Sequence, residues 1–289
     1  LNALRAEGLG RRQGRQHENA GAQGVKPMLH NLKAIYTIWS RDVIRFSRNR
    51  SRIVASLGQP LLFLFVFGAG LSPAMAGLGG GNLKFEQFMF PGILAMSVLF
   101  TAIFAAVSIV WDREFGFLKE VMVAPVSRVA VAIGKLAGGS TVAMFQGTLV
   151  LLFAPLLKIK LALDQAIILI GLMLLLALVM SALGILVAAR QRSMEGFQVI
   201  MNFIMLPMFF LSGAFFPLDG VPIWMELLAK VNPVTYGVDP LRQVALRESI
   251  PATFIEAMRL HPIATDVAVM AAFGLVFLVP AVWLFSKRD

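Results

Sequence analysis

Six long apolar blocks, separated by shorter polar segments, dominate the chain. They cover residues 53–71, 88–110, 136–157, 166–188, 197–216 and 267–285. Each block is close to the roughly 20 residues that a helix needs to cross about 30 Å of hydrocarbon. None alternates polar and apolar positions as the strands of a membrane barrel do. The pattern therefore predicts an all-α, polytopic membrane protein with six transmembrane helices.

Residues 31–50, before the first block, have an amphipathic pattern. Apolar and basic side chains interleave at helical spacing, namely Leu32, Ile35, Tyr36, Trp39, Val43 and Phe46 with Lys33, Arg41, Arg45 and Arg48. This pattern predicts a helix lying in the membrane interface, with Tyr36, Trp39, Arg41 and Arg45 meeting lipid and headgroups. The alternative is a helix packed on a soluble domain, but the sequence shows no soluble domain for it to pack on. Residues 1–27 lack periodicity and predict a disordered N-terminal extension, which leaves residues 28–289 as the transmembrane domain.

A charged segment lies between the second and third blocks. Residues 111–120 read WDREFGFLKE and are followed by APVSR at 124–128. A loop that only reverses the chain needs a few turn residues, and this one is longer. Phe115, Leu118 and Met122 fall on one side of a helix. The segment therefore predicts a short helix at the membrane surface that docks onto a cytosolic protein.

The segment between the fifth and sixth blocks is half apolar and rich in proline and glycine. Residues 213–242 read GAFFPLDGVPIWMELLAKVNPVTYGVDPLR. The pattern predicts two short helices, at 223–230 and 235–248, that dip into the outer leaflet without crossing it. Irregular backbone at that depth needs protein or water around it, so we expect the segment to line or cap a path.

Basic residues set the expected orientation. Nineteen of the 26 Lys and Arg fall on the side that carries both termini. The positive-inside rule then places both termini in the cytoplasm. The chain is 58% apolar with a net charge of +10, and residues 1–52 hold most of that excess. Basic residues beside a first span also attract anionic lipid, so we expect membrane lipid, and no nucleic acid, as a partner.

Candidate chemistry within the blocks is sparse. The chain has no cysteine, and its histidines, His17, His30 and His261, lie outside the blocks. No ionisable residue falls near the middle of a block, where an ion-coupled carrier would need one. We therefore expect no catalytic, cofactor-binding or metal site. Two glycines four residues apart, Gly134 and Gly138, predict close helix packing.

Two further alternatives remain to be weighed. A membrane-embedded enzyme would need paired carboxylates near the surface, and Asp112, Glu114 and Glu120 are candidates by residue type. However, Glu114 and Glu120 interleave with basic residues, which is typical of a solvated face. An ion-coupled carrier is disfavoured because the blocks lack buried charge.

Several of these segments together resemble the permease subunits of type-2 ABC exporters, in the branch of daunorubicin-resistance-like and nodulation-type permeases. The resemblance covers residues 28–289 and rests on FPG at 90–92, WDREFGFLKE at 111–120 with APVSR at 124–128, GK at 134–135, GAFFP at 213–217 and NPVTY at 232–236. It implies two facing permeases, each with six spans, and two ATPase subunits bound below.

The resemblance also implies roles for residues. The coupling helix that contacts the ATPase would be residues 112–125, with Asp112, Arg113, Glu114, Phe115, Gly116, Phe117, Leu118, Glu120 and Pro125. A connecting helix would be residues 31–48. Outer re-entrant helices would lie within 216–248 and include Pro217, Trp224, Asn232, Pro233 and Tyr236.

The expected partners follow from the sequence and the resemblance together. The sequence contains no phosphate-binding loop of the GxxxxGK[ST] kind. ATP and Mg²⁺ are therefore expected on two copies of a separate P-loop ATPase, and this chain is expected to be a transport subunit and not an enzyme. We further expect a homodimer, or a pair with a close relative, in a bacterial plasma (inner) membrane. The expected cargo is an amphiphile, such as a drug, lipid or lipid-linked glycan.

Overall fold

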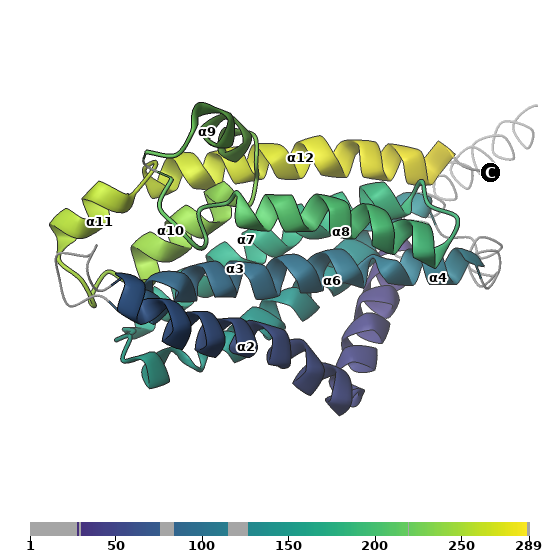
Figure 1. Ribbon diagram of the computed structural model, residues 1–289. Coiled ribbons are helices and arrows are strands. Elements are labelled where there is room, and N and C mark those ends of the chain that lie inside the picture. The colour runs from purple at the N-terminus through teal and green to yellow at the C-terminus, as the bar shows by residue number, and fades with distance from the viewer. Residues whose placement is uncertain (1–27, 29, 76–83, 115–126, 219, 288–289) are drawn as a thin grey trace, which may run out of the picture.

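The computed structural model describes residues 28, 30–75, 84–114, 127–218 and 220–287 (Figure 1). Every regular element within these ranges is a helix, which confirms the all-α prediction. The predictions for residues 1–27 and for most of 112–125 concern residues outside the described ones.

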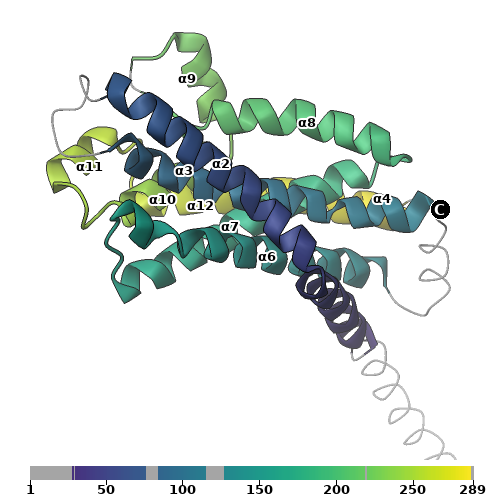
Figure 2. The ribbon, with the colours of Figure 1, turned by 60° about the horizontal axis from the view of Figure 1, so that its bottom comes forward.

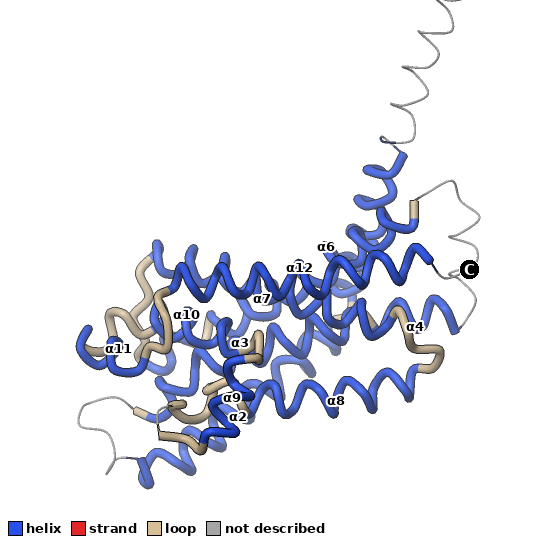
Figure 3. Tube along the Cα trace, turned by 90° about the horizontal axis from the view of Figure 1, so that it is seen from above, coloured by secondary structure: helices blue, strands red, loops and turns tan. Residues whose placement is uncertain are grey.

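Four long helices make up most of the bundle; three form its centre, and the fourth lies at its edge with few residues buried. They are α3 (Phe85–Ala105), α6 (Arg128–Leu151), α7 (Leu163–Ala188) and α12 (Ile263–Lys287). Helix α3 packs against α6 and α7, and α12 lies along α7 (Figure 3). Large side chains of α3, including Phe90, Leu94 and Leu99, are fully buried. In a membrane protein such burial marks contact with other helices, because lipid-facing side chains are exposed in the isolated chain.

Two further apolar helices flank this centre. Helix α2 (Arg50–Met75) crosses α3 and also touches α6 (Figure 2). Helix α8 (Met194–Phe210) begins beside α4 (Val107–Glu114), the helix that continues α3 after Ala106. A methyl group on Gly184 of α7 would lie 3.0 Å from the Ala106 Cβ, so a glycine is needed where α7 passes the junction of α3 and α4.

The described residues contain four helices that are long and apolar enough to cross a membrane: Phe85–Glu114, Arg128–Leu157, Leu163–Ala188 and Ile263–Leu284. They match four of the six predicted blocks. His30–Arg48 and Ile53–Gly68 form a pair bent by 72° that adds a fifth candidate if counted as one span. Met194–Phe210 is apolar but has only 17 residues. The count of six spans therefore stays a prediction.

Short helices gather at the end of the bundle opposite α4 (Figure 1). They are α9 (Ile223–Lys230), α10 (Thr235–Ala245) and α11 (Ala252–Met258), while the 3₁₀ turn η1 (Ala154–Leu157) extends α6. The bounds of α9 are those predicted, and α10 ends three residues earlier than predicted. Helix α10 has 11 residues, about 17 Å, which is too short to cross a bilayer. It packs against α3, α7 and α12.

Candidate functional site

Polar side chains gather at the two ends of the bundle, which we call the α4 end and the α10 end. At the α4 end, Lys135 of α6 is the centre of an ion-pair cluster. Its Nζ lies 3.2 Å from Asp112 Oδ2 of α4 and 3.5 Å from Asp42 Oδ1 of the helix His30–Arg48. Arg41 Nη2 lies 3.3 Å from the same oxygen of Asp112. The cluster thus joins three helices through charge.

Arg113 and Glu114 attach α4 to the connection between α7 and α8. The Arg113 guanidinium donates to the backbone carbonyls of Ala188, Ala189 and Gln191 at the end of α7. A cation is favoured there because a helix C-terminus carries partial negative charge. Glu114 Oε2 accepts a hydrogen bond from the Met194 N–H at the start of α8, at 3.2 Å. Both side chains therefore have intramolecular roles that the sequence did not indicate.

The chain after residue 126 is also attached. The Ser127 N–H donates to Asn31 Oδ1 of the helix His30–Arg48, at 3.0 Å, and the Ser127 hydroxyl caps α6 by accepting from the Ala130 N–H. Phe115, Gly116, Phe117, Leu118, Glu120 and Pro125 lie outside the described residues. The structure thus brings Asp112 of the predicted coupling helix together with Arg41, and Arg113 and Glu114 together with the α7–α8 connection. Both flanks of residues 115–126 are held by other helices.

The helix His30–Arg48 lies directly on the glycines of α6. A methyl group on Gly134 would come within 2.9 Å of Ile38 Cβ, and one on Gly138 within 3.0 Å of Asp42 Cβ. The Trp39 indole donates to Thr141 Oγ1 at 3.0 Å. The predicted packing role of the glycine pair is confirmed, and this packing is what places Asp42 beside Lys135.

The exposed face of the helix His30–Arg48 is consistent with its predicted place in the interface. Tyr36 and Leu32 are exposed, while Arg45 reaches over the Trp111 ring at 6.0 Å. Of the four residues singled out in the sequence, Tyr36 faces outward and Arg45 is exposed. Trp39 and Arg41 contact α6 and α4 instead.

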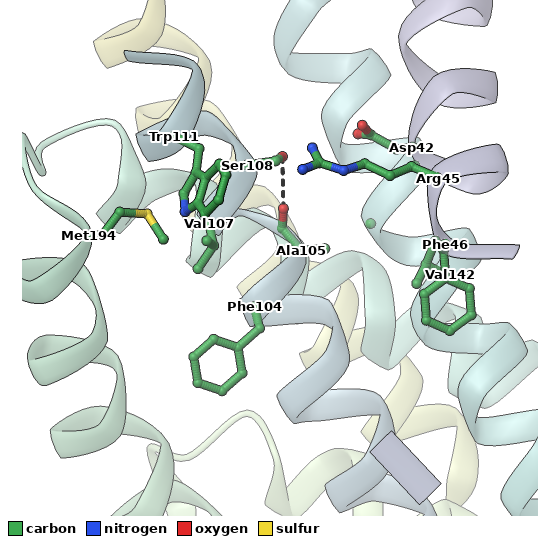
Figure 4. A pocket seen from close by; sticks show the side chains of 12 residues that line it. Asp42, Arg45, Phe46, Phe104, Ala105, Val107, Ser108, Trp111, Val142 and Met194 are labelled. Carbon is green, nitrogen blue, oxygen red and sulfur yellow. Dashed lines mark hydrogen bonds between the residues drawn. The ribbon is translucent and has the colours of Figure 1, made fainter. Parts of the chain in front are cut away.

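Two adjoining cavities form an amphiphilic groove along α3. One, of about 330 Å³, lies among the helix His30–Arg48, α3, α4, α6 and α8. Figure 4 shows Asp42 and Arg45 on one wall and Trp111, Val107 and Phe104 on the other. The second, of about 210 Å³, continues between α2 and α3 and shares Phe46 and Phe104 with the first. The groove runs from a charged mouth through aromatic rings to the hydroxyl and amide groups of Ser56, Gln59, Ser97 and Thr101.

At the α10 end, motifs far apart in the sequence are in contact. A methyl group on Gly92 of α3 would lie 2.7 Å from Ala214 Cβ. The buried Arg242 guanidinium of α10 donates to the Gly213 carbonyl and lies over the Phe88 ring at 4.4 Å. Burial lowers the pKa of Arg242 to about 10, so the side chain stays charged at neutral pH.

The predicted outer residues divide into two groups. Asn232 and Pro233 are buried, and the Asn232 amide donates to the Met208 carbonyl while its Oδ1 accepts from the Val234 N–H. The Tyr236 hydroxyl donates to the Lys230 carbonyl at 2.8 Å; burial, followed by the nearby Asp266 carboxylate, raises the pKa of that hydroxyl. By contrast, Pro217 and Trp224 are exposed. The first group fixes the corner between α8, α9 and α10.

The fold and contacts are those of a helical membrane protein. An ion-pair cluster around Lys135 lies at its α4 end, and the short helices α9, α10 and α11 lie at its α10 end (Figure 1). The chain belongs to the ABC-2 type transporter family, whose sequence pattern matches residues 33–246. The resemblance seen in the sequence is thereby confirmed, and the chain is a membrane transport component of the ABC type.

Two of three known relatives are named as transport permeases and the third as a nodulation protein. A putative transport permease, ycf38, of Cyanophora paradoxa is 28% identical over 73% of this chain and 73% of its own length. Nodulation protein J of Rhizobium leguminosarum bv. viciae is 26% identical over 74% and 82%. The inner membrane transport permease YadH of Escherichia coli K12 is 26% identical over 72% and 81%.

Proposed function

We propose that this chain is the permease subunit of an ATP-driven exporter and that the α4 end receives the motion of a separate P-loop ATPase. The observation that carries the proposal is the attachment of both flanks of residues 115–126. Before that segment, Arg113 and Glu114 bind the α7–α8 connection. After it, Ser127 binds Asn31. A displacement of the segment is therefore passed to α4, α6, α8 and the helix His30–Arg48.

The cargo that we propose is an amphiphile, and the groove supports it. Such a molecule needs a polar contact for its headgroup and apolar contacts for its body. Asp42 and Arg45 supply the first, and Phe46, Phe100 and Phe104 supply the second. Drugs, lipids and lipid-linked glycans all have this chemistry.

A second permease copy is part of the proposal. The groove opens beside α2 and α8, which expose large apolar side chains, including Phe65, Val66, Val199 and Phe203. A pathway closed by a second copy, with two ATPase subunits at the α4 ends, would cover this face. With the ATPase in the cytosol, the α4 end and both termini face the cytoplasm of a bacterial cell.

The test of this proposal measures docking of the ATPase. The change is Phe117→Ala together with Glu114→Ala, in membranes that also contain the ATPase subunit. Truncating an aromatic anchor at an interface often costs about 2 kcal/mol or more, which is roughly a thirtyfold loss of affinity. We therefore expect the double variant to insert normally and to bind the ATPase at least about thirtyfold more weakly in co-purification.

Two controls separate docking from folding. Glu114→Gln keeps an oxygen for the Met194 N–H, so it tests whether the charge or the internal hydrogen bond matters. Glu195→Ala removes an exposed carboxylate in the first turn of α8 and should leave docking unchanged. Wild-type ATPase retention by the Phe117→Ala, Glu114→Ala variant would refute the proposed coupling.

A further inference from the structure

Three side chains that could bind a metal ion meet at the α10 end. Asp239 lies in α10, His261 in the segment before α12, and Asp266 in the first turn of α12. One ligand atom from each lies within 4.8 Å of the other two. In the sequence they are separated by 22 and 5 residues and show no ligand spacing, so no metal site was expected there.

Both carboxylates are buried, and while both are charged they have oxygens that accept no hydrogen bond from the described residues. Asp266 is 0% exposed and Asp239 is 2% exposed. When both carboxylates are charged, neither oxygen of Asp266 nor Oδ1 of Asp239 has a hydrogen-bond partner among the described residues; when one is protonated, the two carboxyl groups hydrogen-bond to each other. Buried carboxylates without partners are costly, and buried charges are normally paired or coordinate metals. Arg242 interacts with the charge of Asp239, but two adjacent carboxylates cannot both stay charged unless a proton or a cation lies between them. The Zn²⁺ measurement below separates these two cases.

One distance in the cluster suits two ligands of a metal ion. His261 Nδ1 and Asp266 Oδ1 lie 3.5 Å apart. Two ligands of a tetrahedral ion with bonds of about 2.1 Å would be separated by about 3.4 Å. The pair is thus spaced like two neighbouring ligands of one metal ion.

The surrounding groups hold the ligands in place. The second oxygen of Asp239 accepts hydrogen bonds from the Leu260 and His261 N–H groups and from Gln243 Nε2. Gln243 also donates to the His261 carbonyl at 2.9 Å, and the Tyr236 ring stacks on the imidazole with centroids 5.5 Å apart. Metal ligands are commonly oriented by such outer contacts.

A cavity reaches one of the three residues. It has a volume of about 320 Å³, reaches His261 and is lined by Tyr236, Lys230 and Glu226 among others. The His261 side chain is 38% exposed. The cavity therefore gives access to the imidazole ring, whose Nδ1 is buried and lies toward Asp266.

We propose that Asp239, His261 and Asp266 bind a divalent transition-metal ion of the Zn²⁺ class. One imidazole nitrogen with two carboxylate oxygens suits Zn²⁺ and its neighbours, whereas Mg²⁺ prefers oxygen ligands and keeps several waters. The ion would fasten α10 to the segment before α12 and to α12 itself. This proposal does not depend on the function proposed above.

The experiment measures bound Zn²⁺ on the purified full-length chain. The protein carries a tag without histidine, is stripped with a chelator, and is dialysed against Zn²⁺ or, in parallel, Mg²⁺ before elemental analysis. We expect one Zn²⁺ per chain and no retained Mg²⁺. His261→Gln and Asp266→Asn should each weaken Zn²⁺ binding by at least about a hundredfold. Gln243→Leu removes the outer hydrogen bonds to Asp239 and His261 and should weaken it by about 10- to 100-fold.

Matched controls come from exposed residues of the same types. His30 and Asp164 are exposed, so His30→Gln and Asp164→Asn should leave Zn²⁺ binding unchanged. If Asp266→Asn does not fold, His261→Gln still tests the proposal. His261 is partly exposed, and this variant leaves both carboxylates in place. Failure of the wild type to retain Zn²⁺, or equal retention by His261→Gln, would overturn the proposal and leave an ordinary His261–Asp266 ion pair.

Discussion

The two ends of the bundle are both polar, but they are held together in different ways. At the α10 end, Arg242 and Asn232 bind backbone carbonyls and are almost fully buried. At the α4 end, Arg113 also binds backbone carbonyls, but Lys135 and Arg41 pair with carboxylates on neighbouring helices. Lys135 is as buried as Arg242, whereas Arg41 is 40% exposed.

This difference has a mechanical meaning. A hydrogen bond to a carbonyl weakens steeply when its geometry changes, whereas attraction between charges falls only gradually with distance. The α10 end is therefore built to keep one geometry. At the α4 end, Arg113 and Glu114 keep one geometry at the α7–α8 connection, whereas the ion pairs among α4, α6 and the helix His30–Arg48 tolerate small shifts between these three helices, as the proposed coupling to an ATPase requires.

Arg242→Met should have the largest effect. It removes a buried cation and leaves the Gly213 carbonyl and the nearby Asp239 without it. Breaking a buried charge pair on one side typically costs about 3–5 kcal/mol, and we expect a loss of that size in the free energy of unfolding in detergent. The exposed Arg259 is the control: Arg259→Met should change stability by less than about 0.5 kcal/mol. Equal stability of the two variants would contradict the description of the α10 end.

Lys135→Met applies the same replacement to the α4 end and should cost less, about 2 kcal/mol. Arg41 remains beside Asp112, and both carboxylates are partly reached by solvent. Combining Lys135→Met with Asp112→Asn should recover part of the loss, giving a coupling energy between about 0.5 and 3 kcal/mol in a double-mutant cycle of unfolding free energies. Strictly additive losses would mean that Lys135 and Asp112 do not interact.

Ser127→Ala should have the smallest effect, about 1 kcal/mol, because it removes only the side-chain cap of α6. The backbone hydrogen bond from Ser127 to Asn31 is retained. Ser193 caps α8 in the same way, by accepting from the Gly196 N–H, so Ser193→Ala is the matched comparison. Unfolding free energies of the two variants should agree. A loss at Ser127 above about 2 kcal/mol would show that the attachment to Asn31 depends on the hydroxyl.

Much of the fold could be predicted because it is encoded locally. Long apolar blocks marked four of the long helices, and the prolines and glycines of residues 213–242 marked a segment of short helices that includes α9. The glycines at 134 and 138 predicted a close helix contact because only small residues allow it. Helix α8 has 17 residues and ends near a proline and a glycine. Its block looked longer in the sequence because apolar residues continue beyond the end of the helix.

The polar clusters could not be predicted because their members are far apart in the chain. Lys135 and Asp42 are brought together by packing of the helix His30–Arg48 across α6. Asp239 and Asp266 meet only because α10 folds back against α12. Likewise, nothing in WDRE indicated that Arg113 and Glu114 bind the α7–α8 connection. The sequence shows which residues are charged, but tertiary packing decides which residue each of them contacts.

The helix Phe85–Glu114 is longer than the hydrocarbon layer of a bilayer is thick. Its 30 residues extend about 45 Å, against a hydrocarbon layer of about 30 Å. Even at the average tilt of about 20°, roughly 12 Å of helix stands beyond the hydrocarbon. That excess length must lie in the headgroup region or in water, at one end of the helix or at both. A thicker membrane would therefore leave less of the helix outside the hydrocarbon, and a thinner one would leave more.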